Sequence, residues 1–523
     1  MQLITPMEQD PELVASASPH AVDSTNTTSR NDDGNQSQYF QSVKLGQNLK
    51  SRTLSGGVLT LALQVFKFVA RFGSIAVLAR LLTPADFGLV AMVTVVTGFL
   101  DTFAEGGLSV ATIQREKITH AQVSTMFWYN LTISAALAVI AIVLAPVLAW
   151  TSSEPRLIPV MIVLGCAIIF NGLAFQHQAL LRRNMLYGRL AIVDAVSLLI
   201  GITSAITMAW WGCGYWALVG MTTITSVSYA ILIFLVTGWI PGGFHSDNDV
   251  REMLHFGVHY SGSACLAQVS QRADNVLIAY FCGVVPLALY DRSFQMMMMP
   301  IRQIDFLASS VLIPTFCRLA PSPDSLRRAI LRSHALLCLS MLPPLAALVV
   351  YSDVAVAIVL GDRWSDAVPI FRLMSGAAVF MCAAKASLWA ALAKGLSNKL
   401  LYYNTFGALT IVPAFLIGVY WGAIGVSIAL LVHSILWAFV LIDFVRKLLD
   451  LTFAQVCGYF WIPFGLVSLL IALGFLWRSN AGATELWSLV VHAVIVSIVC
   501  YGGAGAYFLA GMRFKTRVVD VTV

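Results

Sequence analysis

The sequence has little charge for its length. Only 11% of its 523 residues are Asp, Glu, Lys or Arg, whereas a soluble chain has about 25%. It contains no Walker A motif, and no loop is large enough to house a nucleotide-binding domain. Its nine cysteines are scattered without CxxC or other metal-ligand spacing. We therefore expect no enzyme, no cofactor, no metal site and no disulfide framework.

Apolar runs fill most of the chain instead. Hydrophobic residues make up 58% of it, and the mean hydropathy is +0.80. Runs of about 20 apolar residues match the length of a membrane-spanning helix, so we predict an all-α membrane protein with about 14 transmembrane helices. Residues 1–50 are polar, and we expect a disordered tail there. The expected spans are roughly 57–80, 85–112, 121–149, 156–180, 187–211, 214–237, 252–281, 285–315, 328–351, 366–393, 398–420, 423–446, 453–477 and 485–511.

Basic residues are distributed unevenly between the loops. One set of alternate loops holds most of the Lys and Arg residues, and the other holds only Arg80, Arg156, Arg363 and Arg478. Excess Lys and Arg mark the cytoplasmic side. This pattern predicts that both termini lie in the cytoplasm. It also explains the formal net charge of +6 by topology, so no nucleic-acid partner is expected.

A weak internal repeat suggests two related halves. Ala79–Val90 (ARLLTPADFGLV) aligns without gaps on Ala279–Tyr290 (AYFCGVVPLALY), about six spans later. Repeated halves commonly build alternating-access transporters, with the substrate site between them. We predict two six-helix lobes plus two C-terminal helices. The expected divisions are a tail at 1–50, an N-terminal lobe at 51–240, a C-terminal lobe at 241–450 and the last two helices with a tail at 451–523.

Charged residues lie inside several expected spans. In the first half Lys67 and Arg71 share one helical face, and Asp101 and Glu105 share a face of the next span. A charge at bilayer depth costs at least ~2.5 kcal/mol unless it faces water or a partner. In the second half the charged residues are Arg272, Asp274, Arg292, Arg302, Asp305 and Lys385. Because cations outnumber carboxylates, we expect a net positive lumen.

Two long runs carry a family resemblance. Leu78–Thr119 (LARLLTPADFGLVAMVTVVTGFLDTFAEGGLSVATIQREKIT) resembles the first-loop signature of the polysaccharide-exporter branch of the multidrug/oligosaccharidyl-lipid/polysaccharide (MOP) superfamily, and is most similar to Wzx-type flippases related to the colanic acid exporter. Arg272–Ile304 (RADNVLIAYFCGVVPLALYDRSFQMMMMPIRQI) resembles that family's seventh and eighth helices. The resemblance implies a flippase that moves an undecaprenyl-diphosphate-linked oligosaccharide across the inner membrane, from the cytoplasmic to the periplasmic leaflet, for exopolysaccharide or lipopolysaccharide biosynthesis.

The resemblance also implies a cationic central cavity for the diphosphate and partners of three kinds: the lipid-linked oligosaccharide, membrane lipid and, as candidates, other polysaccharide-assembly proteins. The candidate diphosphate-binding residues are Lys67, Arg71, Arg272, Arg292, Arg302 and Lys385. The candidate residues for ion coupling or charge balance are Asp101, Glu105, Asp274 and Asp305. The candidate hinges are Gly106, Gly107 and Pro300.

Each of these roles has a structural alternative. Lys67 and Arg71 can instead form ion pairs with Asp101 and Glu105, and local pairs are open to Arg272 with Asp274, Arg302 with Asp305 and Arg292 with Asp291. Two other functions also stay open. A drug/cation antiporter of the same superfamily would bind an organic cation with carboxylates and aromatics. A membrane glycosyl polymerase or ligase would need a long catalytic loop, and the longest outward loop, about 352–366, is short.

Overall fold

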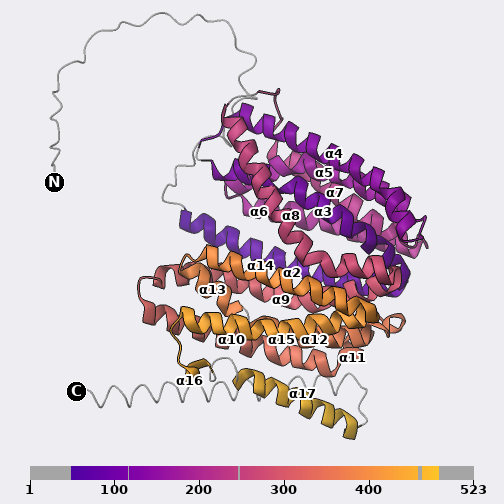
Figure 1. Cartoon of the computed structure of the whole chain (residues 1–523). Coiled ribbons are helices and arrows are strands. Elements are labelled where there is room, and N and C mark those ends of the chain that lie inside the picture. Colours follow the sequence, from indigo (N-terminus) through magenta and orange to yellow (C-terminus); the bar gives the residue numbers. More distant parts are fainter. Residues whose placement is uncertain (1–48, 116, 246–247, 384, 457–461, 482–523) are drawn as a thin grey trace, which may run out of the picture.

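A computed structural model describes residues 49–115, 117–245, 248–383, 385–456 and 462–481, and within these ranges the chain is helical with no strand (Figure 1). The helices are α2 (Leu49–Leu81), α3 (Pro84–Gln114), α4 (His120–Thr151), α5 (Leu157–Arg183), α6 (Tyr187–Trp210), α7 (Trp216–Thr237), α8 (Asn248–Cys282), α9 (Val284–Leu319), α10 (Pro323–Val350), α11 (Ser352–Val359), η2 (Asp362–Trp364), α12 (Ala367–Ala383), α13 (Lys385–Ala393), α14 (Ser397–Gly418), η3 (Val419–Trp421), α15 (Gly422–Leu448), α16 (Phe453–Val456) and α17 (Ile462–Ala481).

These helices confirm the all-α membrane fold. Each of the first twelve expected spans coincides with a long helix, or with two consecutive helices where α12 and α13 share one span. The thirteenth, 453–477, covers α16 and most of α17, and its residues 457–461 lie outside the described residues. In the part of the chain that the structure describes, nine stretches are long and apolar enough to cross a membrane, and two of them join consecutive helices, α12 to α13 and α14 to α15. Helices α8 and α9 are not among these stretches, and both carry several charged residues along their length. The total of 14 stays a prediction, since span 485–511 and nearly all of tail 1–50 lie outside the described residues.

Local signals in the sequence set the helix ends. Thr83 and Thr119 are the N-caps of α3 and α4, and each forms a capping box. The threonine side chain accepts a hydrogen bond from the backbone N–H of the residue three positions later, Asp86 or Gln122, and that residue's side chain accepts one from the threonine N–H. Pro84 follows Thr83 at the first helical position, where its missing N–H costs nothing. Between α8 and α9 the turn is made by Gly283, whose φ of +88° favours glycine. The two repeated turns of the sequence are therefore built differently.

The helices form two bundles. Helices α2 to α7 pack on one another as an N-terminal bundle, and α9 to α15 pack as a C-terminal bundle, with α17 against α10 at the edge of the latter (Figure 1). Helix α8, assigned by the sequence to the second lobe, contacts both bundles. Its first turns share an apolar cluster with α3 and α4, and its last turns pack with α9. The bundles thus share one helix.

Two glycines on α3 let the bundles approach closely. A Cβ added at Gly107 would lie 1.7 Å from the Gly257 carbonyl oxygen of α8, and one at Gly88 would lie 2.1 Å from the Val284 carbonyl oxygen of α9. Gly107, a candidate hinge, is therefore a contact point where two backbones touch. The candidate hinge Pro300 lies inside α9, which continues through it as one helix. The hinge roles of Gly106, Gly107 and Pro300 stay predictions.

The segment that links the bundles is fastened to α4. Ser124 Oγ accepts from the Gly242 N–H at 2.9 Å, and the Trp128 indole N–H donates to the Gly242 carbonyl at 2.9 Å. Thr125 Oγ1 both accepts from the His245 N–H and donates to the His245 carbonyl. The link up to residue 245 is thereby part of the N-terminal bundle.

Exposed aromatic rings mark one end of the molecule. Five of them lie at the ends of α4, α6 and η3 and are 71–85% exposed: Trp150, Trp210, Trp211, Tyr420 and Trp421. Trp and Tyr collect at the membrane–water interface, where an apolar ring with one polar atom is favoured. Large apolar side chains are also exposed along the helices between the two ends. The protein is a multi-pass membrane protein.

Candidate substrate cavity

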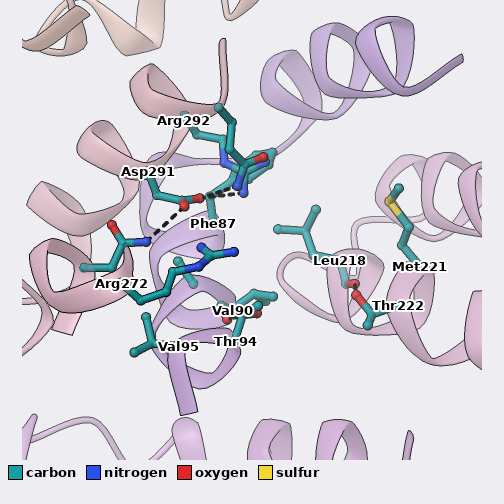
Figure 2. A pocket seen from close by; sticks show the side chains of 13 residues that line it. Phe87, Val90, Thr94, Val95, Leu218, Met221, Thr222, Arg272, Asp291 and Arg292 are labelled. Atoms are coloured by element: carbon teal, nitrogen blue, oxygen red, sulfur yellow. Dashed lines mark hydrogen bonds and ion pairs between the residues drawn. The ribbon is translucent and has the colours of Figure 1, made fainter. Parts of the chain in front are cut away.

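A cavity of about 220 Å³ lies between the two bundles. Helices α3 and α7 form one side of it, and α8 and α9 form the other. Its polar lining consists of Thr94, Thr222, Arg272, Asn275, Asp291, Arg292 and Gln295. Figure 2 shows Arg272 and Arg292 entering from one side, with Leu218 and Thr222 of α7 facing them. With two arginines and one aspartate, the lining carries a net positive charge.

Asp291 is the centre of a hydrogen-bond network. Its carboxylate accepts from the Arg292 guanidinium at 2.8 Å, from the Gln295 amide at 2.8 Å and from the Asn275 amide at 3.3 Å. Arg292 also stacks over the Phe87 ring, 5.1 Å from its centroid. The local pair of Arg292 with Asp291 that the sequence left open is thus formed, and it joins α8, α9 and α3.

Arg272 is the cation of this cavity that has no counter-ion among the described residues. It is exposed, and among the described side chains no carboxylate lies within ion-pair distance of it. The alternative pairing with Asp274 is not formed, because the buried Asp274 accepts instead from the Tyr290 hydroxyl at 2.9 Å. The guanidinium of Arg272 therefore points into the cavity with its five donors unused by a carboxylate (Figure 2).

The other candidate cations lie outside this cavity. Lys67 on α2 forms an ion pair with Asp194 on α6 at 3.0 Å, and Lys385 on α13 forms one with Asp305 on α9 at 2.9 Å. Arg71 and Arg302 are exposed, with no ion pair to any residue that the structure describes. Lys67 thus pairs with Asp194 in place of Asp101 or Glu105, and Asp305 pairs with Lys385 in place of Arg302. The alternative pair of Arg71 with Asp101 or Glu105 is not formed either.

Asp101 and Glu105 line a second cavity, of about 230 Å³, within the N-terminal bundle. Asp101 accepts from the Asn171 amide of α5 at 3.1 Å. The Gln178 amide donates to the Tyr229 hydroxyl at 3.0 Å across the same space. The polar face of α3 therefore serves two cavities: Thr94 lines the one between the bundles, and the two carboxylates line this one.

Two hydrogen bonds close the end of the molecule near the first cavity. The Trp364 indole N–H donates to the Ala79 carbonyl at 3.1 Å, and the Arg80 guanidinium donates to the Ile358 carbonyl at 2.7 Å. We call this pair of bonds the latch. Beside it the Phe87 ring meets Trp364 edge-on at 5.3 Å. The sequence placed no function on Trp364, although it is a tryptophan in a charged loop between two spans.

The opposite ends of α3 and α8 are also in contact. Arg115 pairs with Asp249 at 3.1 Å and with Glu252, and the Gln122 amide donates to Asp249 at 3.2 Å. Both ends of α3 therefore contact the second half of the chain, through Phe87 beside the latch and through Arg115 at the other end. The cavity between the bundles lies between these two contacts, nearer the latch.

Comparison with known proteins agrees with this arrangement. A family model described as "Polysaccharide biosynthesis protein" matches residues 77–369, more than half of the chain. The chain belongs to this polysaccharide biosynthesis family. Among its relatives is the lipopolysaccharide biosynthesis protein WzxC of Escherichia coli, 23% identical over 80% of this chain and 86% of that protein. Another is the teichuronic acid biosynthesis protein TuaB of Bacillus subtilis, 23% identical over 63% of this chain and 69% of that protein.

Solved structures show the same fold. The lipid II flippase MurJ in an inward closed conformation superposes with a TM-score of 0.66 at 13% identity, covering 87% of this chain and 99% of that one. A multidrug MATE transporter of the MOP superfamily, in an inward-facing conformation, gives a TM-score of 0.59 at 15% identity, covering 75% and 98%. The family match confirms the resemblance to polysaccharide biosynthesis proteins, and these structures share the helical fold that the resemblance implies.

Proposed function

We propose that this chain is a flippase that moves a polyprenyl-diphosphate-linked oligosaccharide across the inner membrane for surface polysaccharide assembly. The observation that carries the proposal is the cavity between the bundles, with Arg272 directed into it and no described carboxylate within ion-pair distance of its guanidinium. A guanidinium binds phosphate oxygens through pairs of charge-assisted hydrogen bonds. An anionic head group is therefore the ligand class that suits this cavity best.

The cavity must enlarge during transport. Its volume of about 220 Å³ equals that of about seven water molecules in the liquid, which is too little for an oligosaccharide head group. Opening of the latch at one end, and of the Arg115 contacts at the other, would expose it to each side in turn. This is the alternating access expected of repeated halves.

We place the latch on the side opposite the cytoplasm, and both termini in the cytoplasm. The proposal rests on the excess of basic residues in the loops at the other end. In this orientation the membrane potential favours transport. A head group with about two negative charges gains ~4–5 kcal/mol per 100 mV on moving outward from a negative interior.

The remaining cations have proposed roles along the path. Arg71 and Arg302 are exposed and without a described ion pair, so they are free to meet the head group before it reaches Arg272. Lys67 and Lys385 are held by carboxylates and would need to exchange Asp194 or Asp305 for phosphate. The family relatives named for lipopolysaccharide biosynthesis and for succinoglycan transport, WzxC and ExoT, favour a lipid-linked saccharide as cargo.

A drug/cation antiporter is the second candidate. The cavity inside the N-terminal bundle favours it, because Asp101 and Glu105 lie there with the rings of Phe175 and Tyr229. Carboxylates and aromatic faces bind organic cations. In that case Asp101 would bind the cargo or the coupling ion, and Arg272 would have no part in transport.

Liposomes that contain the purified full chain distinguish the two. A fluorescent polyprenyl-diphosphate-linked sugar should cross them, and Arg272→Ala should slow the crossing about 10- to 100-fold, the loss of about 1.5–3 kcal/mol expected for a hydrogen bond to a charged group. Arg272→Lys should retain part of the rate. Arg156→Ala, which breaks only the exposed pair with Glu154, is the matched control. The flippase proposal would be overturned if Arg272→Ala moved the sugar-lipid at the wild-type rate and the protein transported ethidium in a manner that depends on Asp101.

A further inference from the structure

The latch is a reciprocal capping of helix ends between the two bundles. The last four carbonyls of a helix have no partner within the helix. Ala79 lies in the last turn of α2 and Ile358 in the last turn of α11, and each carbonyl receives a donor from the other bundle: Trp364 for Ala79 and Arg80 for Ile358. Trp364 is fully buried in this contact. The latch therefore needs α11 and η2 to be held in place.

Helix α11 cannot hold this position alone. It has eight residues, and isolated helices shorter than ~12–15 residues are marginal even in favourable sequences. Its first turn is fixed from two neighbours. The Arg372 guanidinium of α12 donates to Ser352 Oγ at 2.8 Å, and the Arg478 guanidinium of α17 pairs with Asp353. One support comes from within the C-terminal bundle, and the other comes from the helix at its edge.

Arg478 makes the more extensive contact. Its Nη1 donates to Asp353 Oδ1 at 2.6 Å and to the Val350 carbonyl at 2.9 Å, and its Nη2 bonds the other oxygen of Asp353. A bidentate arginine–carboxylate pair fixes orientation as well as distance. The guanidinium also lies 5.8 Å from the centroid of the Tyr351 ring. One side chain of α17 thus fastens the end of α10 and the start of α11 together.

We infer that Arg478 is a positioning residue for the latch: α17 holds α11 through Asp353, and α11 in turn presents the Ile358 carbonyl and Trp364 to the N-terminal bundle. Movement of α17 against α10 is thereby coupled to closure of the outer end. This goes beyond the proposed function, because it assigns the first appended helix a part in gating. It requires only that the bundles part at the latch, whatever the cargo.

Amide hydrogen exchange of the purified full chain, followed by mass spectrometry, tests the inference without substrate. In Arg478→Ala, exchange should rise about tenfold in peptides covering 352–364, equivalent to about 1.4 kcal/mol of local opening. It should also rise in peptides covering 79–86, which belong to the other bundle and do not touch Arg478. Asp353→Asn, which keeps the side-chain shape, should act in the same direction. The double variant Asp353→Arg and Arg478→Asp, which exchanges the two charges, should show lower exchange in both regions than Arg478→Ala.

The control is Arg156→Ala, which removes an ion pair at the N-terminal end of α5 and should leave both regions unchanged. If exchange rises at 352–364 but stays at the wild-type level at 79–86, the inference is overturned. A swap that leaves exchange raised also overturns it. Should Arg478→Ala fail to fold, Asp353→Asn and the swap decide by the same criteria. Failure of the proposed flippase appears separately, as absence of sugar-lipid crossing in liposomes.

Discussion

Lys67 on α2 and Asp194 on α6 form an ion pair of 3.0 Å, with side chains 17% and 33% exposed. Helix α2 packs mainly on α6, so this pair fastens the first helix to its bundle. A pair in this setting contributes to stability chiefly because removal of one partner leaves the other charge without compensation.

We expect Asp194→Asn to lower the free energy of unfolding by about 1–2 kcal/mol, less than the loss for a fully buried pair because water still reaches both groups. Lys67→Met combined with Asp194→Leu should recover most of the loss. Thermal unfolding of the purified protein measures both. Asp443→Asn, in the more exposed cluster with Arg446 and Lys447, is the control and should be nearly neutral. A wild-type melting temperature for Asp194→Asn would show that Lys67 does not depend on this partner.

The contact between Gly107 and Gly257 predicts a steep steric effect. Gly107→Ala would place a Cβ 1.7 Å from the Gly257 carbonyl oxygen, so α3 and α8 must separate, at a cost of about 1–3 kcal/mol. Gly98→Ala is a matched control on the same helix, because its Cβ would meet nothing within 4 Å. It should be neutral or stabilising by up to about 1 kcal/mol. Gly107→Ala should therefore shift the unfolding curve toward lower stability and Gly98→Ala should not, and equal shifts of the two variants would contradict the close approach.

Asp291 sets the charge of the cavity between the bundles. In Asp291→Asn the lining keeps both arginines and loses its carboxylate. Affinity for inorganic pyrophosphate should therefore rise about tenfold, or about 1.4 kcal/mol, because the repulsion between the carboxylate and the bound anion is removed. Titration calorimetry measures this. Glu154→Gln also removes a carboxylate, but neither Glu154 nor its partner Arg156 lines the cavity. It should leave the affinity unchanged. Equal affinities for all three proteins would mean that pyrophosphate binds elsewhere.

The pair of Asp353 with Arg478 predicts a pH dependence. The hydrogen bond from Arg478 lowers the pKa of the Asp353 carboxyl below its ordinary value, so the folded state binds that proton less readily than the unfolded state. The stabilisation is present above the unfolded pKa of about 3.9 and is lost as the pH falls through the folded pKa. The melting temperatures of wild type and Asp353→Asn should therefore differ by a constant amount from pH 5 to 8 and converge below about pH 4. A difference that grows on acidification would contradict this.

Much of the fold follows from the sequence, because span length and loop charge depend on composition alone. Helices α8 and α9 were predicted although their charges lower their hydropathy, since the apolar stretches around Arg272 and Arg302 are long enough to span. The two arginines of the cavity were also predicted. In contrast, the partners of Lys67 and Lys385 were missed, because an ion pair between helices depends on how those helices pack. Asp194 offered one signal, as the only carboxylate in the expected span 187–211.

The latch could not be predicted for the same reason. Its acceptors are backbone carbonyls, which every residue has. Its donors, Arg80 in the last turn of α2 and Trp364 in η2, belong to what the sequence presents as outward loops. Only the three-dimensional structure shows that the end of α2 meets the end of α11.

Helix α8 is held by contacts near both of its ends. Near its start it contacts Arg115 and Gly107 of the N-terminal bundle, through an ion pair and a close backbone approach. Near its end it forms hydrogen bonds with Tyr290 and Asp291 of α9. From Gly257 to Asn275 the helix rises about 27 Å. Because α8 is held near both ends, a tilt of one bundle relative to the other must bend or twist α8 between these contacts, or break one of them. The stiffness of these few helical turns then limits how far the transporter can rock.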